Sequence, residues 1–413
     1  MSKQQTTQWG AIIVMIALFA MIAFVTNLCS PMGVIVKNQF GTTNFMAMIG
    51  NYGNFMAYLL MGFPAGMCIK KYGYKKTALI GLLVGIIGII VQWLSGWGGM
   101  AVYLIGALIS GCCMCILNTV VNPMLNLLGG GGNKGNQLIQ IGGTLNSLTA
   151  TLTPLLAGVL VGTVTENTSM TDVSPLLFIG MAVFAISFVI ISRVTIPEPN
   201  FGESESLMDS MKGALRFRHL ILGVIAIFFY VGVEIGIPMQ LNFYVTNMGF
   251  EGSAALGGTL AASYWFMMLI GRFSSTLISG KVSTKTQMTC VSTVAIILLL
   301  IAIFLPESVA VTIKGNAVPM KVFFIAACGL CTSIMWGGIF NLSVEGLGKY
   351  TEAASGIFMM MVVGGGLMPW LQDIIAKQNG EIFSYWLQVA MVAYILFYAL
   401  IGCKNVNKDI KVD

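Results

Sequence analysis

Charged residues are scarce in this sequence. Only 9% of its 413 residues are Asp, Glu, Lys or Arg, whereas a soluble domain usually has about 25%. Hydrophobic residues make up 57%, and the mean hydropathy is +0.87. A chain with so little charge cannot cover a surface that faces water. We therefore expect lipid to be its solvent and the protein to be an all-α membrane protein.

Several chemistries also lack the residues that they need. The single histidine, His219, supports neither a metal site nor a proton relay, and the nine cysteines have no zinc-like spacing. The glycine run at residues 129–132 lacks the Gly-Lys-Ser/Thr ending of a phosphate-binding loop. Basic residues occur in short clusters between apolar runs, so nucleic-acid binding is not expected. The sequence therefore predicts no enzyme, no metal site and no organic cofactor.

Charge-free runs long enough to cross a bilayer occur along the whole chain. A spanning helix needs about 20 mostly apolar residues. The polar N-terminus has no obvious cleavage site and leads into a run that we expect to be retained as a helix. The sequence predicts twelve spanning helices, at residues 11–36, 38–69, two within 77–133 separated by Trp97-Gly98-Gly99, 135–165, 173–192, 220–250, 252–271, 286–306, 322–344, 353–372 and 382–403.

One sizeable polar segment divides these helices into two groups of six. It predicts an N-terminal half at residues 1–196, a cytoplasmic linker at 197–219 and a C-terminal half at 220–413. Two short runs, from Gly111 and around Pro154, can be laid over later runs at offsets of about 218 and 215 residues, which favours pseudo-symmetric halves. This arrangement resembles the major facilitator fold.

The basic residues predict the orientation. With both termini in the cytoplasm, 16 of the 21 Lys and Arg residues lie in cytoplasmic segments, and four lie outside, at Lys37, Lys314, Lys321 and Lys377. The remaining one, Arg272, follows the predicted helix at 252–271 at its inner end. We therefore expect no Arg or Lys in the middle of the membrane.

Glu234 is the sharpest polar feature, because it lies near the middle of the predicted helix at 220–250. A charged side chain at this depth costs about 2.5–3.5 kcal/mol on insertion scales. It should face a cavity and bind a proton, a cation or a substrate hydroxyl. The structural alternative is a protonated carboxyl that bonds to a neighbouring helix. Pro238 should kink or break the helix one turn later.

Neutral polar residues recur inside the other predicted helices. In hydrocarbon their side chains must be paired, so each could serve only to join helices. Together they describe an interior rich in carboxamides, which suits a neutral polyhydroxylated ligand and suits an organic anion poorly. Trp265 and Trp336, with Tyr230 and Tyr264, could stack on a sugar ring or simply pack. The candidate sugar contacts are Asn27, Ser30, Asn118, Asn122, Gln140, Asn146, Gln240 and Trp336.

Several blocks, in order and along nearly the whole chain, resemble the fucose/galactose/glucose symporter family of the major facilitators. The blocks are PAGMCIKKYGYKK from Pro64, LNTVVNPMLNLLG from Leu117, TLNS from Thr144, FYVGVEIG from Phe229, IGRF from Ile270 and the Gly-Gly-Gly-x-x-Pro run from Gly364. The resemblance implies a major facilitator fold and the transport of a sugar.

Two positions depart from the proton-coupled fucose permeases, which look to rely on an Asp in helix one and a Glu in helix four. Those positions align with Ser30 and Asn118, and neither side chain can carry a proton. Glu234 is then the remaining mid-membrane carboxylate for a coupling ion. Sodium is plausible, because a carboxylate with neutral oxygens makes a hard-cation site and several relatives look sodium-dependent. A proton and uncoupled uniport stay open.

The sequence thus predicts a cation-coupled hexose importer that works by alternating access. We expect a monomer in the lipid bilayer of a bacterial inner membrane, with both termini cytoplasmic. An exporter of drugs or small metabolites with the same fold is the main alternative. A membrane-embedded enzyme would need a catalytic constellation that the predicted spans lack, and a scaffold would leave the interior amides with helix pairing alone.

Overall fold

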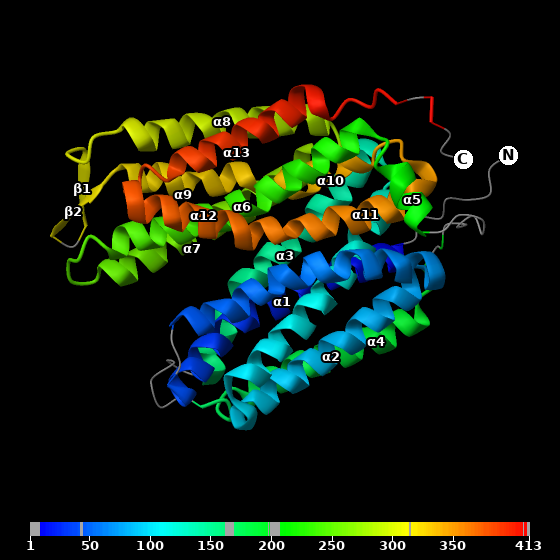
Figure 1. Ribbon diagram of the computed structural model, residues 1–413, viewed down its shortest axis with the longest axis horizontal. Coiled ribbons are helices and arrows are strands. Elements are labelled where there is room, and N and C mark those ends of the chain that lie inside the picture. The colour runs from blue at the N-terminus through cyan, green and yellow to red at the C-terminus, as the bar shows by residue number, and fades with distance from the viewer. Residues whose placement is uncertain are drawn as a thin grey trace.

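The computed structural model describes residues 9–41, 44–161, 169–196, 198, 207–313, 315–407 and 409–410. The helices run side by side along the long axis of the molecule, with the hairpin β1–β2 at one end and the short helix α5 at the other (Figure 1). The end near α5 carries the exposed Lys134, Lys281 and Lys349 and is called the lysine-rich end below. The opposite end is called the hairpin end.

The first part of the chain forms four helices, α1 (Trp9–Phe40), α2 (Asn44–Leu128), α3 (Gly132–Val161) and α4 (Ser174–Arg193). The long α2 is broken twice, at Gly73 and Gly99, whose φ angles are 80° and 77°. L-residues rarely adopt this conformation, whereas glycine does so without a steric penalty. Helix α2 is therefore three helical parts, at residues 44–72, 74–98 and 100–128. The turn predicted at Trp97-Gly98-Gly99 is confirmed.

The second part of the chain contains most of the remaining elements. Two strands form an antiparallel hairpin in which Ala310 lies opposite Pro319. The elements are α5 (Leu207–Ala214), α6 (Arg218–Thr246), α7 (Ser253–Ile278), α8 (Thr284–Phe304), β1 (Ala310–Ile313), β2 (Asn316–Pro319), α9 (Lys321–Thr332), α10 (Met335–Val344), η1 (Gly348–Tyr350), α11 (Thr351–Met360), η2 (Met361–Val363), α12 (Gly364–Asn379), α13 (Tyr385–Phe397) and η3 (Tyr398–Gly402).

Three details differ from the sequence prediction. Helix α6 continues through Pro238 to Thr246, although proline has no N–H to donate and its ring crowds the carbonyl one turn earlier. The predicted helix at 322–344 is interrupted at Ser333 and Ile334, between α9 and α10. Helix α7 continues past the predicted end at residue 271. There the Thr276 hydroxyl donates to the Arg272 carbonyl at 2.9 Å, which satisfies a polar group inside the helix.

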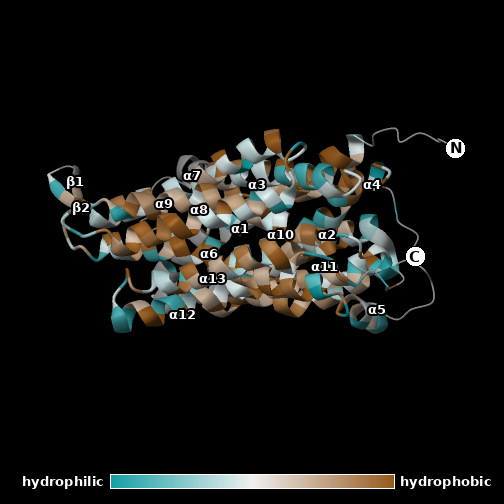
Figure 2. Cartoon of the chain, turned by 90° about the horizontal axis from the view of Figure 1, so that it is seen from above, coloured by the Kyte–Doolittle hydropathy of each residue, from teal (hydrophilic) through white to brown (hydrophobic). Residues whose placement is uncertain are grey.

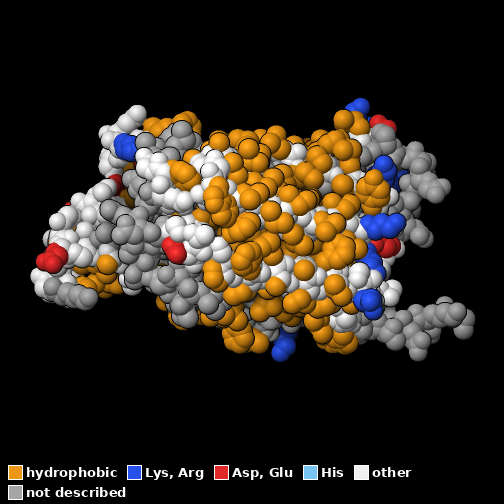
Figure 3. Space-filling model, turned by 90° about the horizontal axis from the view of Figure 1, so that it is seen from below, with side chains coloured by type: hydrophobic (Ala, Val, Ile, Leu, Met, Phe, Trp, Pro, Cys, Tyr) orange, Lys and Arg blue, Asp and Glu red, His pale blue; other side chains and the backbone are white. Residues whose placement is uncertain are grey.

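Apolar side chains cover the outer surface of the helices. Hydrophobic residues fill the middle of the molecule, and Lys and Arg gather mainly toward the lysine-rich end (Figures 2 and 3). Exposed examples are Leu60, Ile186, Leu277 and Phe304. Among the described residues, seven helices are long and apolar enough to cross a membrane, at Gly53–Leu128, Ser174–Arg193, Arg218–Thr246, Thr284–Phe304, Lys321–Val344, Gly348–Asn379 and Tyr385–Gly402.

Glycines allow several helices to cross in close contact. At the crossing of α6 and α12, a Cβ atom added to Gly364 would overlap the carbonyl oxygen of Phe228. At the crossing of α7 and α9, a Cβ atom added to Gly329 would overlap the carbonyl oxygen of Tyr264. Helices inside membranes associate through such small residues, because lipid provides no hydrophobic driving force between them.

We expect Gly364→Ala to destabilise the protein by about 1–3 kcal/mol, because a methyl group there forces α6 and α12 apart. Gly258→Ala is the matched control. Gly258 is also helical, but an added Cβ would meet no atom within 4 Å. Thermal unfolding of the purified protein in detergent would measure both changes. Equal unfolding midpoints for the two variants would contradict the close crossing.

Candidate functional site

Glu234 lies in the middle of α6 on the face that points away from α12. Gly232 and Gly236 pack against Met368, Gln372 and Gln388, so the α12 side of α6 is occupied by these residues. Successive residues of a helix turn by about 100°, which places Glu234 nearly opposite Gly236. Tyr230, one turn earlier, shares the face of Glu234. The side chain of Glu234 is 14% exposed.

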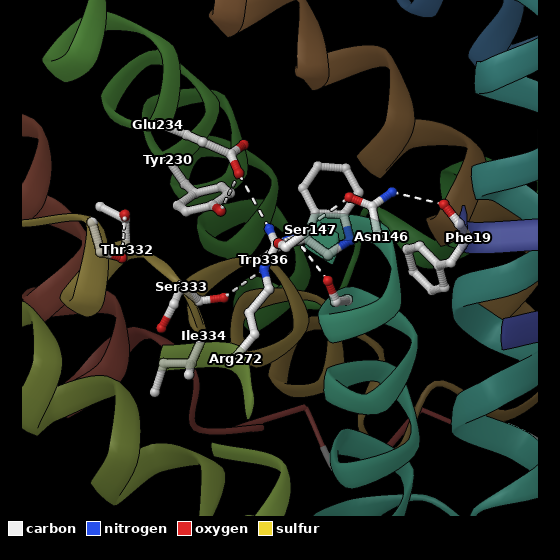
Figure 4. A network of polar contacts seen from close by, with 12 residues as sticks. Phe19, Asn146, Ser147, Tyr230, Glu234, Arg272, Thr332, Ser333, Ile334 and Trp336 are labelled. Carbon is white, nitrogen blue, oxygen red and sulfur yellow. Dashed lines mark hydrogen bonds and ion pairs between the residues drawn. The ribbon is translucent and has the colours of Figure 1, made fainter. Parts of the chain in front are cut away.

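Arg272 on α7 forms an ion pair with Glu234 (Figure 4). Its Nη2 atom lies 3.3 Å from Oε1 of Glu234, and the Tyr230 hydroxyl donates to the same oxygen at 2.9 Å. The side chain of Arg272 is only 10% exposed. Each charge therefore has a partner, as a buried charge requires.

The same guanidinium reaches two further parts of the structure, the break between α9 and α10 and helix α3. Its Nε atom donates to the carbonyl oxygen of Ser333, in the break between α9 and α10, at 3.1 Å. Its Nη1 atom donates to the Gly143 carbonyl at 3.1 Å, to the Ser147 hydroxyl at 2.7 Å and to Oδ1 of Asn146 at 3.5 Å, all on α3. Arg272 therefore joins α3, from the first part of the chain, to α6, α7 and the α9–α10 break.

Arg272 was expected at the inner end of its helix, with no Arg or Lys at the level of Glu234, but the structure pairs it with Glu234. Helix α7 extends to Ile278, so Arg272 lies more than one turn before its end, and its side chain reaches the level of Glu234. A sequence signal was available. An apolar run that holds one carboxylate needs a cationic or protonated partner, and Arg272 is flanked on both sides by apolar residues.

A second polar group lies between the last part of α2 and α10. Asn118 donates to the Tyr58 hydroxyl at 2.7 Å, and Asn122 donates to the Asn118 carbonyl at 2.8 Å. Oδ1 of Asn122 accepts the indole N–H of Trp336 at 3.0 Å. Because Asn118, Asn122 and Tyr58 are buried, these bonds hold the amides in fixed orientations.

Amides of α3 complete the group. Gln140 donates to the carbonyl oxygen of Ile334 at 3.1 Å, and Asn146 donates to the carbonyl oxygen of Phe19 on α1 at 2.8 Å. The Ser333 and Ile334 carbonyls thus accept hydrogen bonds from Arg272 and Gln140, and the Ile334 carbonyl also accepts the Gly338 N–H at 3.0 Å. Among the predicted site residues, Asn118, Asn122, Gln140, Asn146, Trp336 and Glu234 are held by bonds that join α2, α3, α6, α7 and α10.

Two of the predicted site residues, Asn27 and Gln240, stand apart from this group. Asn27 donates to the carbonyl of Ala23 in its own helix at 2.8 Å. Gln240 is 1% exposed and lies on the α6 face of Gly236, away from Glu234, and its Oε1 has no described partner. Ser30 lies outside the residues whose side chains the structure describes. His219, which was expected in the linker, is buried in the first turn of α6, where its Nε2 lies 3.0 Å from the Glu345 carbonyl.

The aromatic candidates divide in the same way. The Trp336 ring lies 6.4 Å from that of Tyr230 and 6.1 Å from that of Phe358. Trp265 is 37% exposed and lies two turns from Arg272 on nearly the same face of α7. Tyr264 instead turns toward α9, where its hydroxyl lies 2.8 Å from that of Thr332. Tyr230 therefore bonds to Glu234 and contacts the Trp336 ring, which brings these two aromatic residues to the ion pair.

A row of contacts continues from Arg272 toward the lysine-rich end. Between α3 and α7, the Thr144 and Thr276 hydroxyls lie 3.3 Å apart, and Gln137 donates to the Thr276 carbonyl at 3.0 Å. Asn126 donates to Oδ1 of Asn341 at 2.6 Å. Nearer this end, Tyr74 donates to Glu352 at 3.4 Å. The first and second parts of the chain are thus joined by hydrogen bonds from the level of Arg272 to the lysine-rich end.

A separate cavity of about 370 Å³ lies at the hairpin end. Burial raises the pKa of Glu381 there, although a hydrogen bond from Asn247 partly offsets the effect. Tyr244, on its wall, is ten residues beyond Glu234, which corresponds to about 15 Å along α6. The cavity is therefore distinct from the ion pair. Its lining residues are Tyr244, Asn247, Met248, Glu307, Asn379, Gly380, Glu381, Ile382 and Phe383.

The helices that surround a polar site are those of a known family. The sequence model of the Major Facilitator Superfamily matches residues 13–369. The chain belongs to this superfamily. It is therefore a multi-pass membrane protein of a transporter family, and the predicted fold class is confirmed at that level.

Curated relatives cover nearly the whole chain. A glucose/galactose transporter of Brucella abortus is 28% identical over 94% of this chain and 93% of its own length. A putative glucose/galactose transporter of Helicobacter pylori is 28% identical over 97% of this chain and 99% of its own length. The L-fucose-proton symporter of Escherichia coli is 22% identical over 92% of this chain and 90% of its own length. They confirm the resemblance to the fucose/galactose/glucose symporters.

Solved structures show the same fold. The crystal structure of the transporter FucP in the outward conformation has a TM-score of 0.82 and 20% identity, over 94% of this chain and 97% of that chain. The proton:xylose symporter XylE has a TM-score of 0.72 and 11% identity, over 98% of this chain and 97% of that chain. At these identities the likeness concerns the fold.

We expect Asn122→Ala and Trp336→Phe to be coupled in stability, because each removes one partner of the same hydrogen bond. Their interaction energy should be about 0.5–1.5 kcal/mol. The control pair combines Asn122→Ala with Trp93→Phe, which removes an indole bond to Ser174 between α2 and α4. The control pair should be additive in unfolding measurements. Additivity of the test pair would mean that the 3.0 Å contact is not formed.

Proposed function

We propose that this protein imports a neutral hexose by cation-coupled symport. The observation that carries the proposal is the Glu234–Arg272 pair at the junction of α3, α6 and α7, surrounded by neutral amides. The pair has no net charge, and carboxamides, a carboxylate and a guanidinium all bond well to sugar hydroxyls. The names of the relatives, two glucose/galactose transporters and a fucose symporter, support the same class of substrate.

We further propose that the chain crosses a bacterial inner membrane twelve times as a monomer, with both termini cytoplasmic. Helix α1, the three parts of α2, α3 and α4 would make six crossings. Helices α6, α7 and α8, the pairs α9–α10 and α11–α12, and α13 with η3 would make the other six. The two halves are then residues 1–196 and 220–413, with a linker at 197–219. The lysine-rich end faces the cytoplasm by the positive-inside rule.

In this orientation the contacts between the level of Arg272 and the lysine-rich end close the cytoplasmic side. They include the Gln137–Thr276 and Asn126–Asn341 bonds, which join the two halves. Alternating access requires these bonds to break when the site opens inward. The protein is then outward-facing in this structure, a reading that the likeness to outward FucP supports.

Glu234 is our candidate for the coupling residue. The position aligned with the fucose-permease glutamate, Asn118, donates to Tyr58 and carries no charge. A proton or a sodium ion at Glu234 are the two alternatives for the coupling cation. Asn118, Asn122, Gln140, Asn146 and Trp336 are the proposed sugar contacts, and Asn27, Ser30 and Gln240 remain candidates from the sequence.

Uptake of labelled glucose, galactose and fucose into liposomes that hold the purified protein tests this function. We expect accumulation when an inward proton or sodium gradient is imposed, and only equilibration without one. The gradient that drives accumulation identifies the coupling ion. No flux of any hexose would overturn the proposal and favour an exporter.

We expect Glu234→Gln to abolish gradient-driven accumulation while changing sugar exchange less, because the amide keeps the hydrogen bonds but not the charge. Glu307→Gln is the control, since Glu307 is 69% exposed at the hairpin end. It should accumulate hexose as the wild type does. Loss of sugar binding in Glu234→Gln with coupling intact would contradict the ion role.

The orientation predicts which residues a membrane-impermeant maleimide can reach. In a cysteine-free background, Gln378→Cys should react in intact cells, because Gln378 is exposed near the hairpin end. Lys281→Cys, exposed at the lysine-rich end, should react only after the cells are permeabilised. The reverse pattern would invert the proposed topology.

A further inference from the structure

Arg272 divides its hydrogen bonds between the two proposed halves of the protein. Within its own half it contacts Glu234 at 3.3 Å and the Ser333 carbonyl at 3.1 Å. In the other half it donates to the Gly143 carbonyl at 3.1 Å and to the Ser147 hydroxyl at 2.7 Å, with Asn146 at 3.5 Å. Any motion that separates α3 from α7 must break the second set and can keep the first.

Glu234 is the one acidic partner of Arg272 in this network. The acceptors on α3 and at Ser333 are a carboxamide, a hydroxyl and backbone carbonyls, which stay neutral. The titratable groups around Glu234 besides Arg272 are the phenols of Tyr230, Tyr58 and Tyr264. Phenols are neutral at ordinary pH. The charge state of Glu234 therefore decides how strongly the Arg272 guanidinium depends on its hydrogen-bond acceptors in α3.

Arg272 also lies at the end of the row of contacts that closes the lysine-rich end. Toward that end, α3 and α7 are joined by the Thr144–Thr276 pair and by Gln137, which donates to the Thr276 carbonyl. These bonds involve only neutral groups. Arg272 thus adds a charged, ion-responsive contact to an otherwise neutral interface.

We propose that Arg272 is a positioning residue that links the charge of Glu234 to the docking of α3 on α7. When Glu234 binds the coupling cation, its negative charge is neutralised and Arg272 loses its anionic partner. The guanidinium then relies on Gly143, Asn146 and Ser147, so the cytoplasmic side stays closed. The carrier that holds the cation without sugar is held outward-facing, and the cation does not leak inward.

A bound hexose removes this restraint. Its hydroxyl oxygens can accept hydrogen bonds from Nη1 in place of the acceptors on α3, so α3 can leave without stranding a buried charge. Sugar and cation must then both be present before the cytoplasmic side opens. This inference rests on the proposed symport function and names the residue that makes the two ligands interdependent.

Spin labels at Lys134→Cys and Lys281→Cys, in a cysteine-free background, report the distance between the cytoplasmic ends of α3 and α7. The full-length protein is reconstituted in liposomes and measured at high and low pH, with and without sodium chloride, before glucose is added. For the wild type we expect the effective cation alone to increase the ratio of closed to open protein at least about threefold. Glucose with that cation should reverse the change.

The variants separate the charge effect from simple loss of contact. Glu234→Gln should be closed without any cation, and Arg272→Gln should show no response to cation. The double variant should behave as Arg272→Gln does, and it leaves no unpaired buried charge, so it remains informative if a single variant folds poorly. Gln137→Ala, the matched control, removes a neutral bond between the same helices. It should lower the closed fraction in every condition and keep the cation response.

Two results would overturn the inference: a cation response that survives in Arg272→Gln, or a wild type that responds to neither cation. Hexose uptake is measured on the same proteoliposomes, so the two proposals can fail separately. Normal uptake with an Arg272-independent response removes the role of Arg272 and leaves the symport function. An Arg272-dependent response without any hexose flux would refute hexose as the substrate and would keep the link between Glu234 and α3.

Discussion

A charged side chain in the middle of a membrane helix must find a partner, and the arrangement of this site follows from that constraint. Glu234 alone would cost a few kcal/mol at bilayer depth, and removing one partner of a buried pair costs about 3–5 kcal/mol. Arg272 compensates Glu234, and its remaining donors need oxygens of their own. The α9–α10 break and one face of α3 provide them at Ser333, Gly143 and Ser147. One ion pair thus fixes how several helices meet.

The turn at Gly99 could be predicted from the sequence, because glycine marks the end of a helical part there. The twelve spans and the polar linker stay predictions. Arg272 could not be placed by the same reasoning. A count of charge-free runs ends a helix at the first charge, whereas α7 continues through Arg272 to Ile278. The break at Ser333 and Ile334 was also missed, since no proline or glycine marks it. Its carbonyls at Ser333 and Ile334 accept hydrogen bonds from Arg272 and Gln140.

The predicted site residues separate by helix face more than by residue type. Asn118, Asn122, Gln140 and Asn146 were chosen as amides in apolar runs, and each bonds to another helix or to an amide that does. Gln240 was chosen on the same ground, but it lies on the Gly236 side of α6, about 120° around the helix from Glu234. The helical period would have shown this, because six residues turn a helix by about 600° and so change its face. Composition identified the polar residues, and the faces decide which can act together.

The departure at Asn118 acquires a physical meaning in this arrangement. Asn118 holds the Tyr58 hydroxyl and Asn122, and Asn122 holds Trp336, so the position that aligns with a carboxylate here orders neutral groups of the proposed sugar site. The charge lies instead in the C-terminal half, at Glu234, and faces α3 through Arg272. Glu234 itself bonds only within its own half, to Arg272 and Tyr230. In the proposed mechanism its charge therefore acts on the boundary between the halves through Arg272, whose other hydrogen bonds reach α3.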